Sequence, residues 1–301
     1  MAPPGTNDQT VFEDHRRYLQ GVAYRMLGSV AEAEDVVQDA YLRWSNAREA
    51  EAGALRSYLT RIVVRLCLDR LKAARTVREQ YVGAWLPEPM LTEEVEPAAG
   101  SELLQDLSFG LLLLLERLSP LERAAFLLHD VFDMDFDTVA EVLESSPAAC
   151  RQLAVRGRQH LQQDRQKPRY RPSAEEGRSL TNAFLRAAYT GDATTLASML
   201  AEDARLISDG GGRRPAALNP LIGADRIVRF FVGLVAKARA AGVDLGLTAR
   251  PATLNGLPGA LVFDPRGLER AVALEFDANR QVRSVYMVLN PDKLRALSRP
   301  D

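Results

Sequence analysis

Residues 136–155 read FDTVAEVLESSPAACRQLAV, a pattern of two helices joined by a tight turn. Ala140 is the small residue needed where a second helix crosses closely, Ser146 is a good N-cap, and Pro147 suits the first helical position. Glu144 stands where glycine is common in such turns, and a left-handed backbone there would cost about 1–2 kcal/mol. The stretch predicts a helix-turn-helix.

The second helix of this stretch has two unlike faces when residues are placed about 100° apart. Small or apolar residues face inward, namely Cys150, Leu153, Gly157 and Leu161. Residue types that read base edges and bind phosphate face outward, namely Arg151, Gln152, Val155, Arg158 and Gln159. This arrangement favours a helix that enters the major groove of duplex DNA. The alternative is a helical hairpin with a basic surface.

A second basic helix is expected upstream, within residues 55–75. Its apolar residues gather on one side, namely Leu55, Leu59, Ile62, Val63 and Leu66. Basic residues gather on the other side, namely Arg61, Arg65, Lys72 and Arg75. One side therefore buries while the other presents positive charge. The alternative is the solvated face of an ordinary amphipathic helix.

Residues 31–44, AEAEDVVQDAYLRW, predict a further helix with acids in its first turn, where the helix dipole favours them. Val37, Tyr41 and Trp44 recur at helical spacing and should pack inward, while Gln38 and Asp39 should face solvent. This face is interpreted either as an acidic contact surface for a protein partner or as part of a well-capped core helix.

Charge is arranged in blocks, although the formal net charge is only −2. Residues 56–78 and 151–171 each carry seven basic groups against one acid, whereas residues 86–144 carry fourteen acids and two bases. Phosphate binding depends on the local density of lysine and arginine rather than on their total. The two basic blocks therefore favour nucleic-acid contact despite a pI near 6.0.

Length and composition exclude several classes of protein. The 301 residues suggest two or three domains, and 47% hydrophobic with 26% charged residues is ordinary globular composition. No signal peptide or membrane span is expected, because the longest apolar run is about half the length of a membrane span. The two cysteines, Cys67 and Cys150, fit a reducing cytoplasm, where we expect the protein. The spacings of metal ligands and phosphate loops do not occur, so neither metal nor cofactor is expected.

Composition shifts divide the chain into five segments. Helical patterns occupy residues 1–80 and 102–165, and linkers are predicted at 81–101 and 166–174. Residues 175–301 begin with a helix and continue in short strand-like segments such as GALVFD, RAVALEF and RSVYMVL. The expected fold is thus two all-α domains followed by an α+β domain.

Three runs resemble the small extracytoplasmic-function (ECF) sigma factors of bacterial RNA polymerase, in the family's order. AYRMLGSVAEAEDVVQDAYLRW (23–44) and LRSYLTRIVVRLCLDRLKAARTVRE (55–79) resemble region 2, and residues 115–161 resemble region 4. Three short stretches resemble the signatures of the branch with a fused C-terminal SnoaL-like domain: YVGAWLPEP (81–89), DGGG (209–212) and NPDKL (290–294). That domain has the α+β cone (cystatin-like) fold of polyketide cyclases.

The resemblance implies a sigma factor that binds core RNA polymerase and recognises the −10 and −35 elements of promoter DNA. Docking on the β′ coiled coil is carried over to Asp35, Gln38 and Asp39, and region 4 is expected to meet the β flap. The −10 element would be lined by Arg61, Arg65, Arg70, Lys72, Arg75 and Arg78, with Asn46 in the loop after Trp44 as candidate pocket for an extruded base. The −35 element would be read by Arg151, Gln152, Val155, Arg156 and Arg158.

The resemblance also implies regulation in cis by the C-terminal domain, with no separate anti-sigma factor. The expected regulatory contacts are Trp85, Pro87, Glu88, Pro89, Asp209, Gly210, Gly211, Gly212, Asn290, Pro291, Asp292 and Lys293. The alternatives are a stiff spacer for WLPEP, a tight turn for DGGG and a capped helical turn for NPDKL. The cavity of the cone is a candidate site for an unidentified small ligand.

Two other classes of function compete with this interpretation. A cyclase- or isomerase-like enzyme fused to a DNA-targeting module would need an acid/base pair in its cavity. The three histidines, His15, His129 and His160, all precede the C-terminal domain, so no catalytic residue is assigned and no enzyme is expected. A self-sufficient helix-turn-helix regulator that dimerises on palindromes would leave the acidic helix at 31–44 without a role.

Overall fold

The structure, a computed structural model, divides into two compact units. The first comprises residues 1–80 and 99–165, and the second comprises residues 81–98 and 166–301. The residues that the structure describes are 6–47, 55–79, 81–92, 108–162, 169–242 and 246–298. The segment 81–92, expected as part of a linker, thus belongs to the C-terminal unit.

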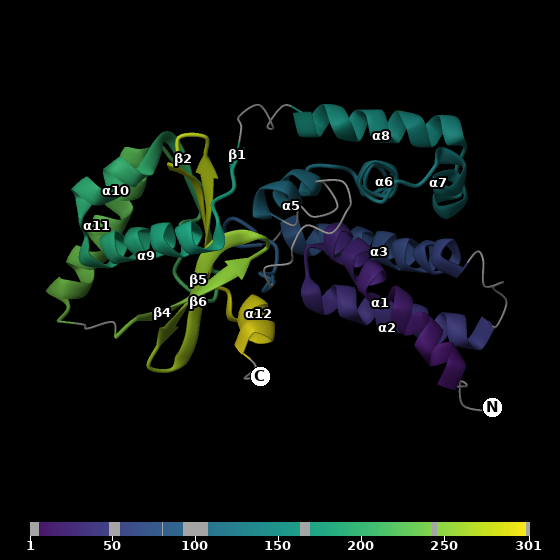
Figure 1. The fold of residues 1–301 in the computed structure, drawn as a ribbon, viewed down its shortest axis with the longest axis horizontal. Coiled ribbons are helices and arrows are strands. Elements are labelled where there is room, and N and C mark those ends of the chain that lie inside the picture. The colour runs from purple at the N-terminus through teal and green to yellow at the C-terminus, as the bar shows by residue number, and fades with distance from the viewer. Residues whose placement is uncertain are drawn as a thin grey trace. The chain divides into compact units, whose positions relative to one another are not determined.

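Three long helices pack against one another in the first unit (Figure 1): α1 (Thr6–Leu27), α2 (Val30–Ala47) and α3 (Leu55–Glu79). The ring of Phe12 lies in their core, 5.0 Å from the ring of Tyr41 and 5.8 Å from that of Trp44. Val37 and Trp44 are buried, which confirms the inward face predicted for this part of α2.

Shorter helices follow in the same unit: α5 (Phe109–Glu116), α6 (Pro120–Phe126), η2 (Leu127–Val131), α7 (Phe136–Leu143) and α8 (Pro147–Gln162). The Ser146 hydroxyl caps α8 by accepting a hydrogen bond from the amide of Ala149 at 3.2 Å. Glu144 ends α7 in the left-handed region, with φ 52° and ψ 48°. Gly157 lets α8 approach α6, because a Cβ there would lie 3.3 Å from the Cβ of Phe126. The predicted helix-turn-helix is confirmed.

Within the described residues, seven strands of the second unit form one sheet in the order β3-β2-β7-β6-β5-β4, with β1 paired to β6. The strands are β1 (Arg169–Tyr170), β2 (Leu200–Asp209), β3 (Leu221–Ile222), β4 (Thr248–Leu254), β5 (Leu257–Asp264), β6 (Gly267–Asp277) and β7 (Val282–Val288). β2 runs parallel to β7, and the other pairs are antiparallel. The expected α+β fold is confirmed.

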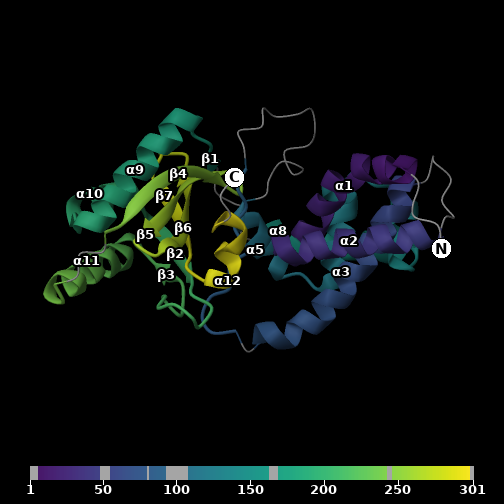
Figure 2. The ribbon, with the colours of Figure 1, turned by 90° about the horizontal axis from the view of Figure 1, so that it is seen from below.

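Helices cover one face of this sheet (Figures 1 and 2): α9 (Ala174–Thr190), α10 (Ala193–Met199) and α11 (Ala224–Ala240). Phe184 and Phe231 of these helices pack with Leu274 and Val285 of the sheet in one buried cluster. In the described part of the chain, no helix combines the length and the apolar composition that crossing a membrane requires.

The opposite face of the sheet receives the C-terminal elements α12 (Pro291–Leu294) and η3 (Arg295–Ser298), both of which contact β6. Alternation along β6 directs Leu274 toward the helices, so that Ala273 and Glu275 point to this opposite face. Asp209, at the end of β2, and the segment 81–92 meet here as well.

Candidate nucleic-acid interface and the Asp209 cluster

The outer face of α8 presents most of the residues predicted to read the −35 element. Arg151, Gln152, Val155 and Arg156 are all exposed and adjoin one another on the surface. The guanidinium of Arg151 lies 5.4 Å from the centre of the Phe136 ring, a cation–π contact that orients it at the start of the helix. This face can meet both bases and phosphates.

Arg158, the fifth of these residues, is engaged within the protein. Its Nε lies 2.5 Å from Oδ1 of Asp130, and both side chains are partly buried. The ion pair joins α8 to η2, so Arg158 holds the recognition helix in place. Sequence reasoning placed Arg158 on the outer face and could not see this partner 28 residues away.

The outer face of α3 carries Arg61, Arg65 and Lys72, as the helical spacing indicates. Arg61 Nη2 lies 3.0 Å from Oε2 of Glu141, and Arg65 pairs with Glu144. Lys72 is exposed, 3.6 Å from Asp69 on the same helix. The sequence did not indicate that Glu141 of α7 and Glu144, the C-cap of α7, are the partners of these arginines.

Arg70 lies on another side of α3 from Arg61, Arg65 and Lys72, which were also predicted to line the −10 element. It follows Arg61 by nine residues, which is about half a turn beyond two full turns at about 100° per residue. Its guanidinium donates to Oδ2 of Asp39 at 3.1 Å and to the carbonyl of Glu32 at 2.8 Å. The side chains of Arg75 and Arg78 lie outside the described residues.

The residues of α2 expected to dock on polymerase lie close together. Asp35 and Gln38 are exposed, while Asp39 is partly covered by its ion pair with Arg70. Asn46 was expected in a loop after Trp44, but α2 continues through Ala47. Asn46 is therefore an exposed residue of the last helical turn.

A buried carboxylate organises the C-terminal unit. The side chain of Asp209 is fully buried, and its Oδ1 accepts a hydrogen bond from the Tyr81 hydroxyl at 2.6 Å. Its Oδ2 accepts from the Leu86 amide at 2.9 Å and from Lys293 Nζ at 2.7 Å. We call Tyr81, Leu86, Asp209, Asn290 and Lys293 the Asp209 cluster. Burial and the Asp209 carboxylate raise the pKa of the Tyr81 phenol.

Lys293 connects all parts of this cluster. Besides Asp209, its ammonium donates to the carbonyl of Leu86 at 2.5 Å. The same nitrogen lies 4.2 Å from the centre of the Trp85 ring and 5.0 Å from that of Tyr81. A buried ammonium needs this combination of a counter-ion, a carbonyl and aromatic faces, because its desolvation is costly.

The DGGG and NPDKL stretches meet in the same place. Gly211 has φ +59°, and a Cβ there would lie 2.3 Å from Nδ2 of Asn290. Asn290 caps α12 by accepting a hydrogen bond from the amide of Asp292 at 3.0 Å, and its Nδ2 donates to the Tyr81 hydroxyl at 2.9 Å.

An ion pair also joins the two stretches, since Oδ2 of Asp292 lies 3.0 Å from Nε of Arg213. Gly210 and Gly212 belong to the same turn, and Pro291 opens the helix. The tight turn and the capped helical turn are therefore both present, and they also contact each other.

The WLPEP stretch is buried rather than spread through solvent as a spacer. Leu86, Pro87, Glu88 and Pro89 are all buried. Further along, the Met90 amide donates to Oδ1 of Asn255 at 3.0 Å, at the turn between β4 and β5. The twelve described residues 81–92 therefore do not act as a free tether, because many of them are held in this way.

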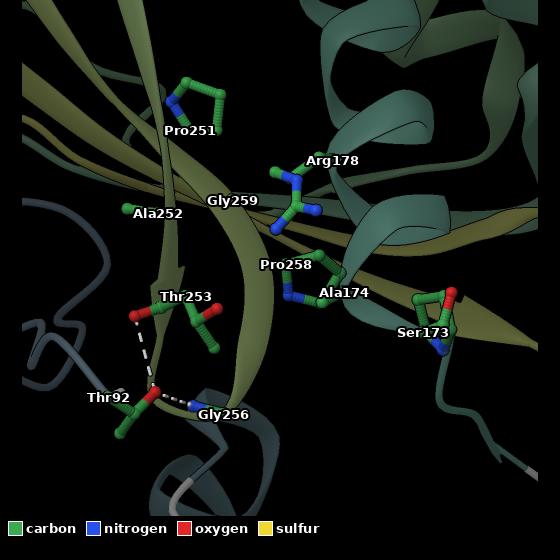
Figure 3. A pocket seen from close by; sticks show the side chains of 11 residues that line it. Thr92, Ser173, Ala174, Arg178, Pro251, Ala252, Thr253, Gly256, Pro258 and Gly259 are labelled. Atoms are coloured by element: carbon green, nitrogen blue, oxygen red, sulfur yellow. Dashed lines mark hydrogen bonds between the residues drawn. The ribbon is translucent and has the colours of Figure 1, made fainter. Parts of the chain in front are cut away.

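Figure 3 shows the end of this segment at an open pocket of about 330 Å³. The Thr92 hydroxyl donates a hydrogen bond to the Thr253 carbonyl at 3.3 Å and accepts one from the Gly256 amide at 2.9 Å. Arg178 of α9 supplies the charge among the lining residues. The cluster around Phe184 and Phe231 packs between the sheet and the helices that cover it. Among the described residues, no group of three His, Cys, Asp or Glu is placed to hold a metal ion.

Comparison with known proteins agrees with this geometry. The families Sigma-70 region 2 and Sigma-70, region 4 match residues 11–77 and 108–161. The ECF RNA polymerase sigma factor SigJ of Mycobacterium tuberculosis (strain ATCC 25618 / H37Rv) is 38% identical over 290 residues, which cover 94% of this chain and 91% of SigJ. "Probable ECF RNA polymerase sigma factor SigI" of M. tuberculosis (strain CDC 1551 / Oshkosh) is 32% identical over 285 residues, covering 94% and 93%.

The likeness extends to three dimensions. The crystal structure of M. tuberculosis SigJ aligns with a TM-score of 0.72 and 35% identity, over 95% of this chain and 97% of that one. The alignment therefore includes both the helical unit and the α+β unit. With these relatives along nearly its whole length, the chain belongs to the ECF sigma factors, which direct promoter-specific initiation by RNA polymerase.

Proposed function

We propose that the C-terminal unit of this sigma factor modulates its promoter-specific transcription in cis. The observation that carries the proposal is the burial of Leu86–Pro89 against the C-terminal unit, anchored by Asp209 and Lys293. This segment connects sigma region 2 to sigma region 4 in the chain. Contacts that hold this segment restrict how far regions 2 and 4 can separate, and release of the segment lets the two regions reach separate promoter elements.

In the same proposal, the two basic faces read the promoter. Arg151, Gln152, Val155 and Arg156 of α8 engage the −35 element as duplex in the major groove. Arg61, Arg65 and Lys72 of α3 line the −10 element, where a captured single strand needs cations along its backbone. Asn46, which is exposed in the last turn of α2, is a candidate contact for an extruded base.

The exposed acids of α2 supply the contact with polymerase. Asp35 and Gln38 face solvent, and Asp39 is held beside them by Arg70. An acidic face of this kind suits the basic β′ coiled coil, while region 4 meets the β flap. With a control element already attached, the proposal needs no separate anti-sigma factor and no catalytic step. An unidentified small ligand of the C-terminal unit is one way in which control could be relieved.

Run-off transcription with bacterial core polymerase tests the proposal. The full chain is compared with Lys293→Met, which removes the ammonium from the Asp209 cluster, and with a chain that ends at Tyr170. A change in promoter-specific transcripts per bound polymerase supports control in cis, and its direction gives the sign. Equal output from all three chains would show that the C-terminal unit does not regulate.

A matched control is Lys237→Met, since Lys237 is exposed on α11 and lies outside the Asp209 cluster. It should transcribe as the full chain does. If no version yields transcripts and none binds core polymerase, the assignment of polymerase and promoter contacts is overturned as well.

A further inference from the structure

Phe136 is the first residue of α7, and its ring contacts side chains of two neighbouring elements. The imidazole of His129, in η2, stacks on this ring, with 3.9 Å between the ring centroids and 28° between the ring planes. The guanidinium carbon of Arg151, in α8, lies over the same ring at 5.4 Å from its centroid. We call these three side chains the Phe136 stack.

Two local hydrogen bonds hold the Phe136 ring in place. Asp135 caps α7, since its Oδ1 accepts a hydrogen bond of 2.8 Å from a backbone amide of the first turn. Nδ1 of His129 lies 2.8 Å from the carbonyl oxygen of Met134, which fixes the plane of the imidazole. These residues all lie within the match to sigma region 4, so contacts inside that region orient the ring.

Arg151 differs from the other described arginines of α8 in its contacts. Arg156 and Arg158 each pair with a carboxylate, at 3.5 Å and 2.5 Å. Arg151 pairs with no acid among the residues that the structure describes, and the Phe136 ring takes the place of one. A carboxylate accepts hydrogen bonds from a guanidinium, whereas a ring orients it through the electrostatic attraction of its face. The N–H donors of Arg151 therefore stay available to a ligand while the side chain is held.

Arg151 also stands where a recognition helix meets the bases of DNA. α8 begins at Pro147, so Arg151 lies just after its first turn, and the side chain is exposed. In helix-turn-helix proteins, the N-terminal residues of the second helix contact base edges in the major groove. The commonest specific contact there is an arginine that donates two hydrogen bonds to O6 and N7 of guanine. An arginine whose guanidinium is oriented in advance loses less rotamer freedom when it makes this contact.

We propose that the Phe136 stack positions Arg151 to read one guanine of the −35 element through the O6 and N7 atoms of that base. Phe136 and His129 are positioning residues, because they act on DNA through Arg151. A phosphate contact, the other common use of an exposed arginine, would carry no preference for a base. The inference rests on the proposed role of α8 at the −35 element.

Holoenzyme assembled from the full chain and bacterial core polymerase supplies the DNA probe. It transcribes a promoter library that is randomised at the −35 and −10 elements, with each template identified by a barcode in its transcript. The parent chain should enrich guanine at one position of the −35 element. Arg151→Ala should lose that preference at this position alone, while the other positions keep theirs. An unchanged preference in Arg151→Ala would overturn the inference.

A single-atom change in the enriched promoter tests the contact with N7. Replacement of the enriched guanine by 7-deazaguanine removes the N7 acceptor and keeps the pairing with cytosine. The affinity of the parent holoenzyme for this duplex should fall by about 2- to 12-fold, the effect of one lost hydrogen bond. Holoenzyme with Arg151→Ala should bind both duplexes equally. An equal fall in Arg151→Ala would mean that another group contacts N7.

Variants of Phe136 separate positioning from a general structural role. Phe136→Leu removes the ring and should lower the affinity for the enriched promoter by about 2- to 5-fold, the effect of an exposed cation–π contact. Phe136→Tyr keeps the aromatic face and should restore the affinity. In an Arg151→Ala background, Phe136→Leu should have no further effect. A merely structural role would lower the affinity to the same extent in both backgrounds.

Phe109→Leu is the matched control, since Phe109 is a buried ring of α5 that lies outside the Phe136 stack. This change should lower the melting temperature of the chain and leave the preference for guanine as in the parent. Loss of the preference in Phe109→Leu as well would show that any damage to the core of region 4 removes it, which would overturn the positioning role of Phe136.

The library also distinguishes failure of the inference from failure of the proposed function. If Arg151→Ala lowers output from every −35 sequence by the same factor, α8 still contacts the −35 element, but Arg151 binds phosphate and the inference fails. If the parent chain transcribes all −35 sequences equally well, the role of α8 at this element fails, and the inference fails with it.

Discussion

The Asp209 cluster and the ion pairs Arg61–Glu141 and Arg65–Glu144 both join distant parts of a unit through carboxylates and cations, but in opposite surroundings. Asp209 is fully buried and Lys293 nearly so, whereas Glu141 and Glu144 are mostly exposed. Removing one member of a buried pair leaves an uncompensated charge, which costs about 3–5 kcal/mol. An exposed pair contributes about 0–1 kcal/mol. The first contact therefore contributes much more to stability than the second.

The largest expected effect comes from breaking the buried cluster. Asp209→Ala should lower the free energy of unfolding of the C-terminal unit by about 3–5 kcal/mol, because Lys293 and the Leu86 amide lose their acceptor. Urea unfolding followed by Trp85 fluorescence, in a Trp44→Phe background, reports on this unit alone. Glu202→Gln, an exposed carboxylate change on the same strand, is the control and should cost little. Equal effects of the two changes would contradict the structural role of the cluster.

The close approach at Gly211 gives the next effect. Gly211→Ala combines a left-handed backbone with a Cβ that would lie 2.3 Å from Asn290 Nδ2. We expect a loss of about 2–4 kcal/mol in the free energy of unfolding, measured as above. Gly242 has φ +61° but open space where a Cβ would lie, so Gly242→Ala should lose only the free energy that a left-handed backbone costs a residue with a side chain. A loss no greater than that of Gly242→Ala would mean that the DGGG turn does not pack as described.

Within the helical unit, Arg151 and Arg158 should separate promoter reading from helix positioning. Arg151→Ala should weaken binding of a −35 duplex by about 1–3 kcal/mol, the value of a good base contact. Arg158→Ala should change this affinity less but should lower the melting temperature, since Asp130 loses its partner. Fluorescence anisotropy and thermal unfolding of the full chain measure the two quantities. Equal losses of DNA affinity in Arg151→Ala and Arg158→Ala would mean that Arg158 contacts the duplex as Arg151 does.

The smallest effect at neutral pH is expected from Tyr189. Its hydroxyl is buried and has no hydrogen-bond partner in the described residues, and burial raises its pKa to about 12. Its contribution to stability is complete below the ordinary pKa of about 10 and is lost as the pH rises from about 10 to 12. Tyr189→Phe should raise the free energy of unfolding by about 1 kcal/mol at pH 7, because it removes a buried hydroxyl that has no partner among the described residues. The variant should lose less stability than the parent between pH 10 and 12 in urea titrations.

The local features of the fold could be predicted from the sequence because they depend on neighbouring residues. The Ser146 cap, the left-handed Glu144 and the inward face of α2 all follow from spacing within about two helical turns. The assignment of Arg70 to the −10 face ignored its position half a turn away from Arg61. Asn46 was placed in a loop although no glycine or proline between Trp44 and Ala47 ends the helix.

The tertiary partners could not be predicted in the same way. Tyr81 lies 128 residues from Asp209, and Arg61 lies 80 residues from Glu141. The YVGAWLPEP stretch contained Tyr81 as well as Trp85, but no local pattern indicates that its proline-rich chain is buried. The burial of Asp209 likewise depends on where the chain returns with Lys293. The roles assigned to these residues stay predictions until the variants above are measured.

The distance in sequence between Leu86 and Lys293, 207 residues, has a consequence for synthesis of the chain on the ribosome. At about 5–20 residues per second, Leu86 waits about 10–40 s before its partner is made. During that time the apolar residues of the WLPEP stretch lack the C-terminal surface that buries them in the folded protein. Under the proposed function, the basic helices α3 and α8 are complete well before the C-terminal unit that would control them, so each new molecule would be unregulated while it is still a nascent chain.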